Sequence, residues 1–183
     1  EVPIMLSPYG EYGAVGYFSY GPDGYAMAEG SETVCDAYGD PAWPDGPERV
    51  RDVFRHVVDI FRAEEVTNVT WFYYTSTNYM NADYEDFTWE HPGYYCPGEE
   101  YVDWVGNSAY FADGEAQTGG ASVNDIDYAL VDGIAAWREV TDKPFIVPEF
   151  GLVGQPGESR SELLRKTLEE DIPRLGIDAF ALA

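Results

Sequence analysis

Short apolar runs alternate with amphipathic stretches along this chain of 183 residues. Apolar, aromatic and β-branched runs typical of buried strands occupy residues 2–6, 68–75, 102–106, 143–150 and 177–182. Apolar residues at steps of three and four predict helices over residues 47–65 and 123–140. Ser159 and Glu162 form a capping box that predicts a third helix, which ends near residue 175.

The order of these elements predicts a parallel sheet, because strands that alternate with helices are typical of α/β folds. Nearly continuous apolar strands are expected where both faces of such a sheet are covered. Two arrangements fit: a doubly wound open sheet, or part of a (β/α)₈ TIM barrel. Five strands are too few for a full barrel, which typically needs ~250 residues. In both arrangements we expect the chemistry at the carboxyl ends of the strands.

Long segments rich in Gly, Asp, Pro and aromatic residues follow the first two strands, over residues 8–46 and 76–99. Loops of this length are usually functional or carry short local structure. Sugar rings present apolar faces that stack on aromatic side chains, so a carbohydrate cleft is one interpretation. Packing of the aromatic side chains against the sheet is the other.

The charge balance is strongly acidic, with 34 Asp and Glu against 10 Lys and Arg and a formal net charge of -24. This argues against a nucleic-acid partner, which needs a basic patch, and against an electrostatic anchor on an anionic membrane. No apolar window of about 18 residues could span a bilayer. The excess of carboxylates favours a halophilic protein kept soluble by charge, and an ordinary acidic secreted protein is the alternative.

Two cysteines, Cys35 and Cys96, fit either a disulfide between loops or two free thiols. Neither a CxxC nor an HExxH pattern occurs, so we expect no zinc site of those kinds.

Two glutamates are conspicuous by position, because Glu11 follows the first predicted strand and Glu149 ends the fourth. A carboxylate at the end of an apolar strand is costly unless it is hydrogen-bonded or functional. Two carboxylates that face each other at strand ends are the usual equipment for glycoside cleavage. One acts as the general acid and the other attacks the anomeric carbon.

Three segments resemble glycoside hydrolase family 26, the family of β-mannanases and related endo-glycanases. Residues 95–106 (YCPGEEYVDWVG) resemble its YYPGDEYVDWVG segment, and residues 143–151 (KPFIVPEFG) match its KP…EFG strand. Residues 53–78 are similar to its FR…NV.WVWSPN run. The three segments agree with the family in order and spacing, so the resemblance covers most of the chain.

The resemblance implies a retaining endo-glycosidase with a (β/α)₈ barrel, β-mannan as the leading substrate, and no metal or organic cofactor. It makes Glu149 the nucleophile and places Glu11 where the family has its acid/base, although GEYG at residues 10–13 replaces the family's HExNG. It also implies that Tyr110 hydrogen-bonds the nucleophile. The other candidate substrate contacts are Trp71, Trp104, Asn78, Tyr12 and Tyr17. A non-catalytic carbohydrate-binding relative is the alternative.

In the family's strand numbering, residues 2–6 would form strand four and residues 177–182 strand eight. We therefore expect residues 1–183 to be the carboxyl-terminal part of a catalytic domain, with an exposed sheet edge. A missing N-terminal segment or a second chain would complete it. We also expect a secreted, extracellular protein whose partner is a polysaccharide.

Overall fold

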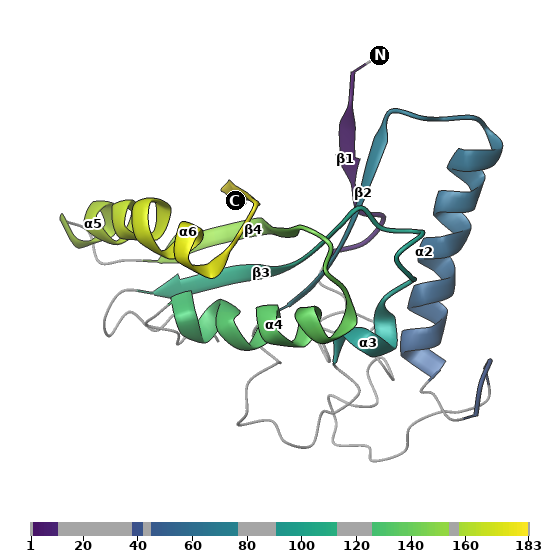
Figure 1. Ribbon diagram of the computed structural model, residues 1–183, viewed down its shortest axis with the longest axis horizontal. Coiled ribbons are helices and arrows are strands. Elements are labelled where there is room, and N and C mark those ends of the chain that lie inside the picture. The colour runs from purple at the N-terminus through teal and green to yellow at the C-terminus, as the bar shows by residue number, and fades with distance from the viewer. Residues whose placement is uncertain are drawn as a thin grey trace.

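The computed structural model describes residues 2–10, 38–41, 45–76, 91–112, 126–153 and 158–182. Its five strands are all parallel and lie side by side in chain order (Figure 1). They are β1 (Ile4–Leu6), β2 (Val69–Ser76), β3 (Trp104–Ala112), β4 (Phe145–Val153) and β5 (Ala179–Leu182). A doubly wound sheet reverses its strand order at a switch point, whereas this order is strictly sequential. The chain therefore forms an incomplete (β/α)₈ barrel, as the resemblance implied.

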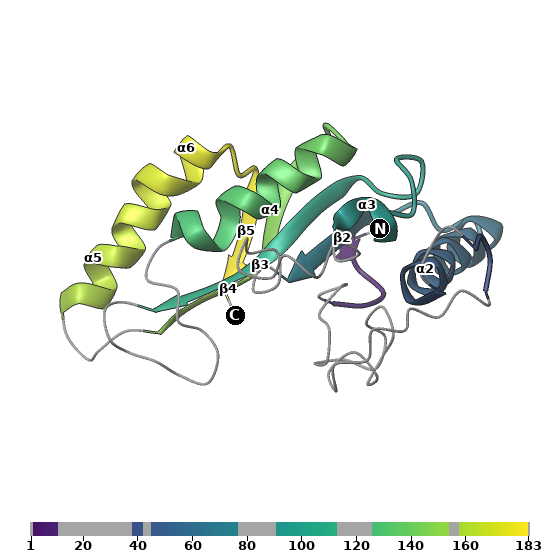
Figure 2. The same cartoon turned by 90° about the horizontal axis from the view of Figure 1, so that it is seen from below.

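The three predicted helices form with small shifts, and a further short helix lies within the loop predicted over residues 76–99. The helices are α2 (Asp45–Ala63), α3 (Pro92–Tyr95), α4 (Ile126–Val140), α5 (Glu158–Lys166) and α6 (Ile172–Leu175). A π-helical turn, η3 (Thr167–Asp171), joins the last two, so the single helix predicted there is interrupted. Figure 2 shows α4, α5 and α6 on one face of strands β3 and β4. No helix within these described ranges is long and apolar enough to cross a bilayer.

Strand β3 extends well beyond the predicted range of residues 102–106 and ends at Ala112. Asn107 and Ser108 interrupt the apolar run, yet both are buried in the sheet. The amide of Asn107 donates to the hydroxyl of Thr75 on β2 at 2.6 Å, which satisfies a polar group that would be costly to bury alone. A hydrogen-bonded polar pair thus continues the strand where the apolar pattern stops.

The core lies between the sheet and its helices. Phe54 of α2 meets Trp71 and Tyr73 of β2 edge-on, with ring centroids 6.2 and 5.5 Å apart. Trp137 of α4 packs against Tyr73 at 5.8 Å and donates its indole N–H to the Gly106 carbonyl at 3.0 Å. Because side chains alternate along a strand, Trp71 and Tyr73 face the helices while Phe72 and Tyr74 face the barrel interior.

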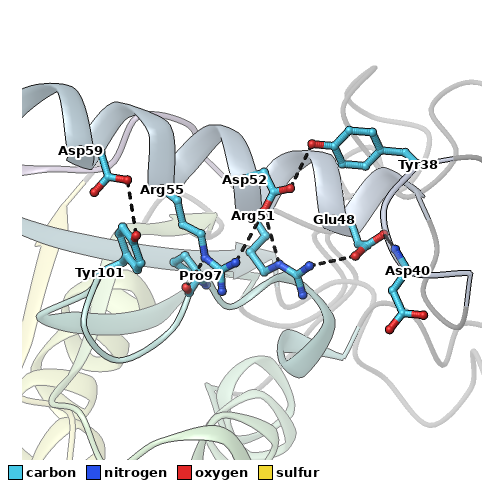
Figure 3. A network of polar contacts seen from close by, with 9 residues as sticks. All are labelled: Tyr38, Asp40, Glu48, Arg51, Asp52, Arg55, Asp59, Pro97 and Tyr101. Carbon is cyan, nitrogen blue, oxygen red and sulfur yellow. Dashed lines mark hydrogen bonds and ion pairs between the residues drawn. The ribbon is translucent and has the colours of Figure 1, made fainter.

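The segment before β3, which carries much of the family resemblance, is fastened to α2. Arg55 donates from Nε to the Pro97 carbonyl at 2.6 Å (Figure 3). Arg62 donates to the Glu100 carbonyl. The guanidinium of Arg62 also lies 4.9 Å from the centre of the Tyr101 ring. These contacts lie near the amino end of β3, where a barrel is stabilised rather than where its chemistry occurs.

Asp103 ties the same segment to β2. Its carboxylate accepts a hydrogen bond from the backbone N–H of Trp71 at 2.8 Å, and its own N–H donates to the Trp71 carbonyl at 2.8 Å. The two bonds fix where β3 starts against β2. The Asp of the DWVG segment therefore has a structural task.

Candidate active site

Glu149 is the fifth of the nine residues of β4, which continues past the predicted strand end to Val153, and its carboxylate is held on both oxygens. The Tyr74 hydroxyl of β2 donates to Oε1 at 2.5 Å, and the Tyr110 hydroxyl of β3 donates to Oε2 at 2.8 Å. Glu149 and Tyr110 are half-buried, and Tyr74 is buried. Hydrogen bonds to an ionised acceptor are short and strong, so two such donors fix the orientation of this carboxylate.

A β-bulge in β4 turns Glu149 towards these tyrosines. From Ile146 to Phe150, β4 advances four residues, while the paired residues of β3, Gly106 and Ala109, are three apart. Against β5, the step from Val147 to Phe150 is likewise one residue longer than its counterpart. The extra residue is therefore Pro148 or Glu149. Proline lacks a ladder N–H and is tolerated at bulges, which re-aim the side chains that follow.

Gly151, two residues after Glu149 in β4, makes room for Tyr110. Gly151 and Tyr110 are register partners across β4 and β3. A Cβ at Gly151 would overlap the Tyr110 ring, so any larger residue would displace the phenol that holds Glu149. The glycine of the EFG motif therefore serves the Glu149 carboxylate through Tyr110.

The segment that follows β1 approaches the same carboxylate at Gly10. A Cβ built on Gly10 would lie 3.6 Å from Glu149 Oε1 and would overlap the Tyr74 hydroxyl. Gly10 is the residue before Glu11 in the sequence. Glu11 itself lies outside the described residues, as do Tyr12, Tyr17 and Asn78, and the roles assigned to them stay predictions.

The structure does not bring the two predicted tryptophans to Glu149. Trp71 is 8% exposed and packs edge-on against Phe61 of α2, with ring centroids 5.1 Å apart, on the helix side of the sheet. Trp104 is the first residue of β3, six positions before Tyr110. At ~3.3 Å per residue it lies roughly 20 Å from Tyr110 along the strand. Both tryptophans therefore lie away from the Glu149 carboxylate.

Tyr74 is the site residue that the sequence pattern did not reveal. In the run Trp71 to Thr75, every residue looks like core because all are aromatic or β-branched. The signal available was the strand's alternation: if Trp71 and Tyr73 face the helices, Tyr74 faces the barrel interior.

Two further sequence questions concern metals and thiols. Among the residues that the structure describes, no group of three or more His, Cys, Asp or Glu is placed to hold a metal ion.

Cys96 is a half-buried free thiol, and Cys35 lies outside the described residues. Burial raises the pKa of the Cys96 thiol, an effect that the nearby Arg55 guanidinium partly opposes.

A sequential parallel barrel sheet with an oriented carboxylate towards its carboxyl edge is the framework of a barrel-type glycoside hydrolase. The model of "Glycosyl hydrolase family 26" matches residues 1–147 of the chain. The chain belongs to this family.

One curated relative and two solved structures show how far the likeness extends. Endoglucanase H of Acetivibrio thermocellus is 34% identical over 97 residues, which are 53% of this chain and 10% of that protein. A double mutant of the Cellulomonas fimi endo-β-1,4-mannanase is 20% identical to this chain, with a TM-score of 0.51. The superposition covers 74% of this chain and 29% of the mannanase chain. The endo-β-1,4-mannanase catalytic domain of Bacillus sp. JAMB-750 is 17% identical, with a TM-score of 0.52. The superposition covers 74% of this chain and 34% of that domain's chain. The two structures support the barrel fold, and the chain spans about a third of each.

Proposed function

We propose that the protein is a retaining glycoside hydrolase that cuts within a β-linked polysaccharide, with β-mannan as its substrate. The observation that carries this proposal is the Glu149 carboxylate, held by Tyr74 and Tyr110 towards the carboxyl end of the barrel strands. An oriented carboxylate at this edge is what a glycosidase nucleophile requires.

In the proposed reaction, one Glu149 oxygen attacks the anomeric carbon and forms a glycosyl-enzyme, while Glu11 protonates the departing sugar oxygen. Glu11 then takes a proton from water, whose oxygen displaces Glu149 and restores the original configuration. Such a pair needs carboxyl groups about 5–5.5 Å apart. The approach of Gly10 to Glu149 supports this assignment, because Glu11 is the next residue. The mechanism needs no metal or organic cofactor.

The choice of mannan is supported by the two solved mannanases that share the barrel fold. A β-glucan is the second candidate, because the similar stretch of 97 residues belongs to a protein named Endoglucanase H. Polysaccharides such as mannan and β-glucan are too large to enter a cell and are degraded outside it, so we propose that the protein is secreted.

The sheet also supports a proposal about completion of the barrel. Among the described strands, β1 and β5 are the two edges, and the β1 side chains Ile4 and Met5 are 44% and 46% exposed. We propose that further strands, from the same gene product or from a second chain, pair with these edges.

The test is hydrolysis by the complete native protein of mannan, β-1,3-xylan and mixed-linkage glucan in high salt. Glu149→Gln should remove hydrolysis while the thermal unfolding midpoint stays near that of the wild type. Glu139→Gln is the matched control, because Glu139 is an exposed residue of α4 that pairs with His91. NMR of the first-formed sugar should show the β-anomer. Near-wild-type activity of Glu149→Gln, or an α-anomer as first product, would overturn the proposal.

The alternative function is carbohydrate binding without cleavage, and the GEYG sequence at residues 10–13 favours it. It predicts that the wild-type protein is retarded in a polysaccharide gel while releasing no reducing ends. Retardation together with hydrolysis would exclude this alternative.

A further inference from the structure

We propose that Tyr74 is a second catalytic hydrogen-bond donor to Glu149, and that it acts mainly when the glycosyl-enzyme is hydrolysed. This inference rests on the proposed function, since it assigns Tyr74 a role in the second step of that reaction. Tyr74 transfers no proton; its hydroxyl stabilises the carboxylate as a leaving group.

The geometry gives Tyr74 its own carboxylate oxygen. Its hydroxyl lies 2.5 Å from Oε1, whereas Tyr110 occupies Oε2. It reaches Glu149 from β2, two strands away from β4, a span of roughly 9.6 Å that only a long side chain can bridge. The Tyr74 side chain is 6% exposed, and its ring stacks on Phe72 with centroids 5.7 Å apart. The phenol is therefore held in place before any substrate binds.

The position of Gly10 shows that the Tyr74 hydroxyl lies inside the site. A side chain at Gly10 would overlap this hydroxyl, which lies between Gly10 and Glu149. In the proposed reaction, that is the space between the residues leading to the acid/base and the nucleophile. Gly10 has no Cβ to compete for it.

The charge on Glu149 changes in opposite directions in the two steps. In the first step the carboxylate becomes an ester, so a hydrogen bond that stabilises the anion favours the reactant. In the second step the bond between Glu149 and the anomeric carbon breaks, and its electron pair returns to the carboxylate. The water oxygen bonds to the anomeric carbon and its proton goes to Glu11. A preorganised donor stabilises charge as it develops, so Tyr74 assists this second step.

The test separates the two steps with 2-deoxy-2-fluoro-β-mannobiosyl fluoride and its cellobiosyl analogue, applied to the complete native protein. The fluorine at C2 slows both steps and the fluoride leaving group speeds the first, so the glycosyl-enzyme accumulates. Mass spectrometry of the peptide that contains Glu149 measures labelling, and loss of the label after the probe is removed measures the second step. Tyr74→Phe should label within about threefold of the wild-type rate. It should lose the label about 10- to 100-fold more slowly, as expected when a hydrogen bond to a charged group is removed.

The matched control is Tyr73→Phe, the same change at the next residue, whose ring packs between Phe54 and Trp137 on the helix side. Its labelling and label-loss rates should both stay near wild type. Gly10→Ala provides a second variant, because the added methyl group displaces the Tyr74 hydroxyl while the ring stays stacked on Phe72. It too should slow the loss of label.

The outcomes separate this inference from the proposed function. Loss of the label at the wild-type rate in Tyr74→Phe would overturn the inference, and so would equal slowing of both steps. If wild-type Glu149 takes up no label from either probe while the protein hydrolyses a polysaccharide, the proposed nucleophile itself is wrong.

Discussion

Gly151 and Tyr110 face each other across β4 and β3, and the ring of Tyr110 occupies the place where a side chain at residue 151 would lie. The same phenol donates to Glu149 Oε2 at 2.8 Å. The missing side chain at Gly151 therefore determines where the hydrogen-bond donor of Glu149 can sit.

Gly151→Ala should lower hydrolysis by about 10- to 100-fold, because the methyl group pushes Tyr110 away from Glu149 and removes a hydrogen bond to a charged group. The kcat of the variant on the best polysaccharide checks this. In a Tyr110→Phe background the hydrogen-bond donor is already absent, so adding Gly151→Ala should lower kcat little further. Strictly additive losses, or a fully active Gly151→Ala, would contradict the account.

Trp71→Phe tests where this indole acts. Trp71 packs against Phe54 and Phe61 between the sheet and α2. Replacing the indole with the smaller phenyl ring should therefore lower the free energy of unfolding by about 1–3 kcal/mol through loss of packing. The KM for polysaccharide should stay unchanged. Denaturant unfolding and steady-state kinetics on the same preparation measure both quantities. A raised KM at unchanged stability would return Trp71 to the substrate site.

Asp103→Ala should destabilise the fold by roughly 1–3 kcal/mol, because the part-buried N–H of Trp71 loses its carboxylate acceptor. Urea unfolding gives the change. Asp142→Ala is the matched control on an exposed residue and should stay within about 0.5 kcal/mol of wild type. If the two variants unfold alike, the Asp103 carboxylate is not what fixes the start of β3.

Alkylation of Cys96 should be slow in the folded protein and should accelerate at a higher pH than in the unfolded chain. Burial raises the pKa of this thiol in the folded state, so folding favours the protonated form. Its contribution to stability is present below the pKa of the unfolded thiol and is lost as the pH rises through the folded value. Iodoacetamide labelling of the Cys96 peptide, with and without denaturant, gives the two pH curves. Coincident curves would exclude the effect of burial.

Added salt should raise the unfolding temperature. The net charge of -24 makes the folded chain repel itself, and salt shortens the screening length from about 10 Å at 0.1 M to about 3 Å at 1 M. Salt also screens the attraction within exposed ion pairs such as Arg165–Glu169, but this loss is small because such pairs stabilise by about 0–1 kcal/mol. Calorimetry in 0.1 and 1 M NaCl measures the shift. A lower unfolding temperature at 1 M would show that attractive pairs dominate.

The apolar pattern predicted the strand and helix order because burial on a sheet or a helix leaves a period in the sequence. The pattern could not show the bulge, since residues 144–148 are apolar on both faces and an extra residue leaves no mark there. It ended β3 too early, because Asn107 and Ser108 are buried through a hydrogen bond that pairs positions 32 residues apart.

The site was predictable in part. A carboxylate at the predicted end of an apolar strand is anomalous by itself, so position alone made Glu149 a candidate, and the resemblance gave it the role of nucleophile. Tyr74 looks like any core aromatic until its facing direction is known, and that direction is fixed by contacts with β4. Trp71 had the opposite problem, because a tryptophan near a sugar site and one beneath a helix give the same sequence signal.

The extra residue at Pro148–Glu149 means that inward and outward positions of β4 are counted in two different frames, one before it and one after. A regular ladder that kept every residue of β4 would pair Glu149 with Ala109 in place of Phe150. It would send the carboxylate to the helix side and point Phe150 towards the lumen. The irregular backbone and the chemistry are thus inherited together, and a strand of the same length without the bulge could fold well and still be inert.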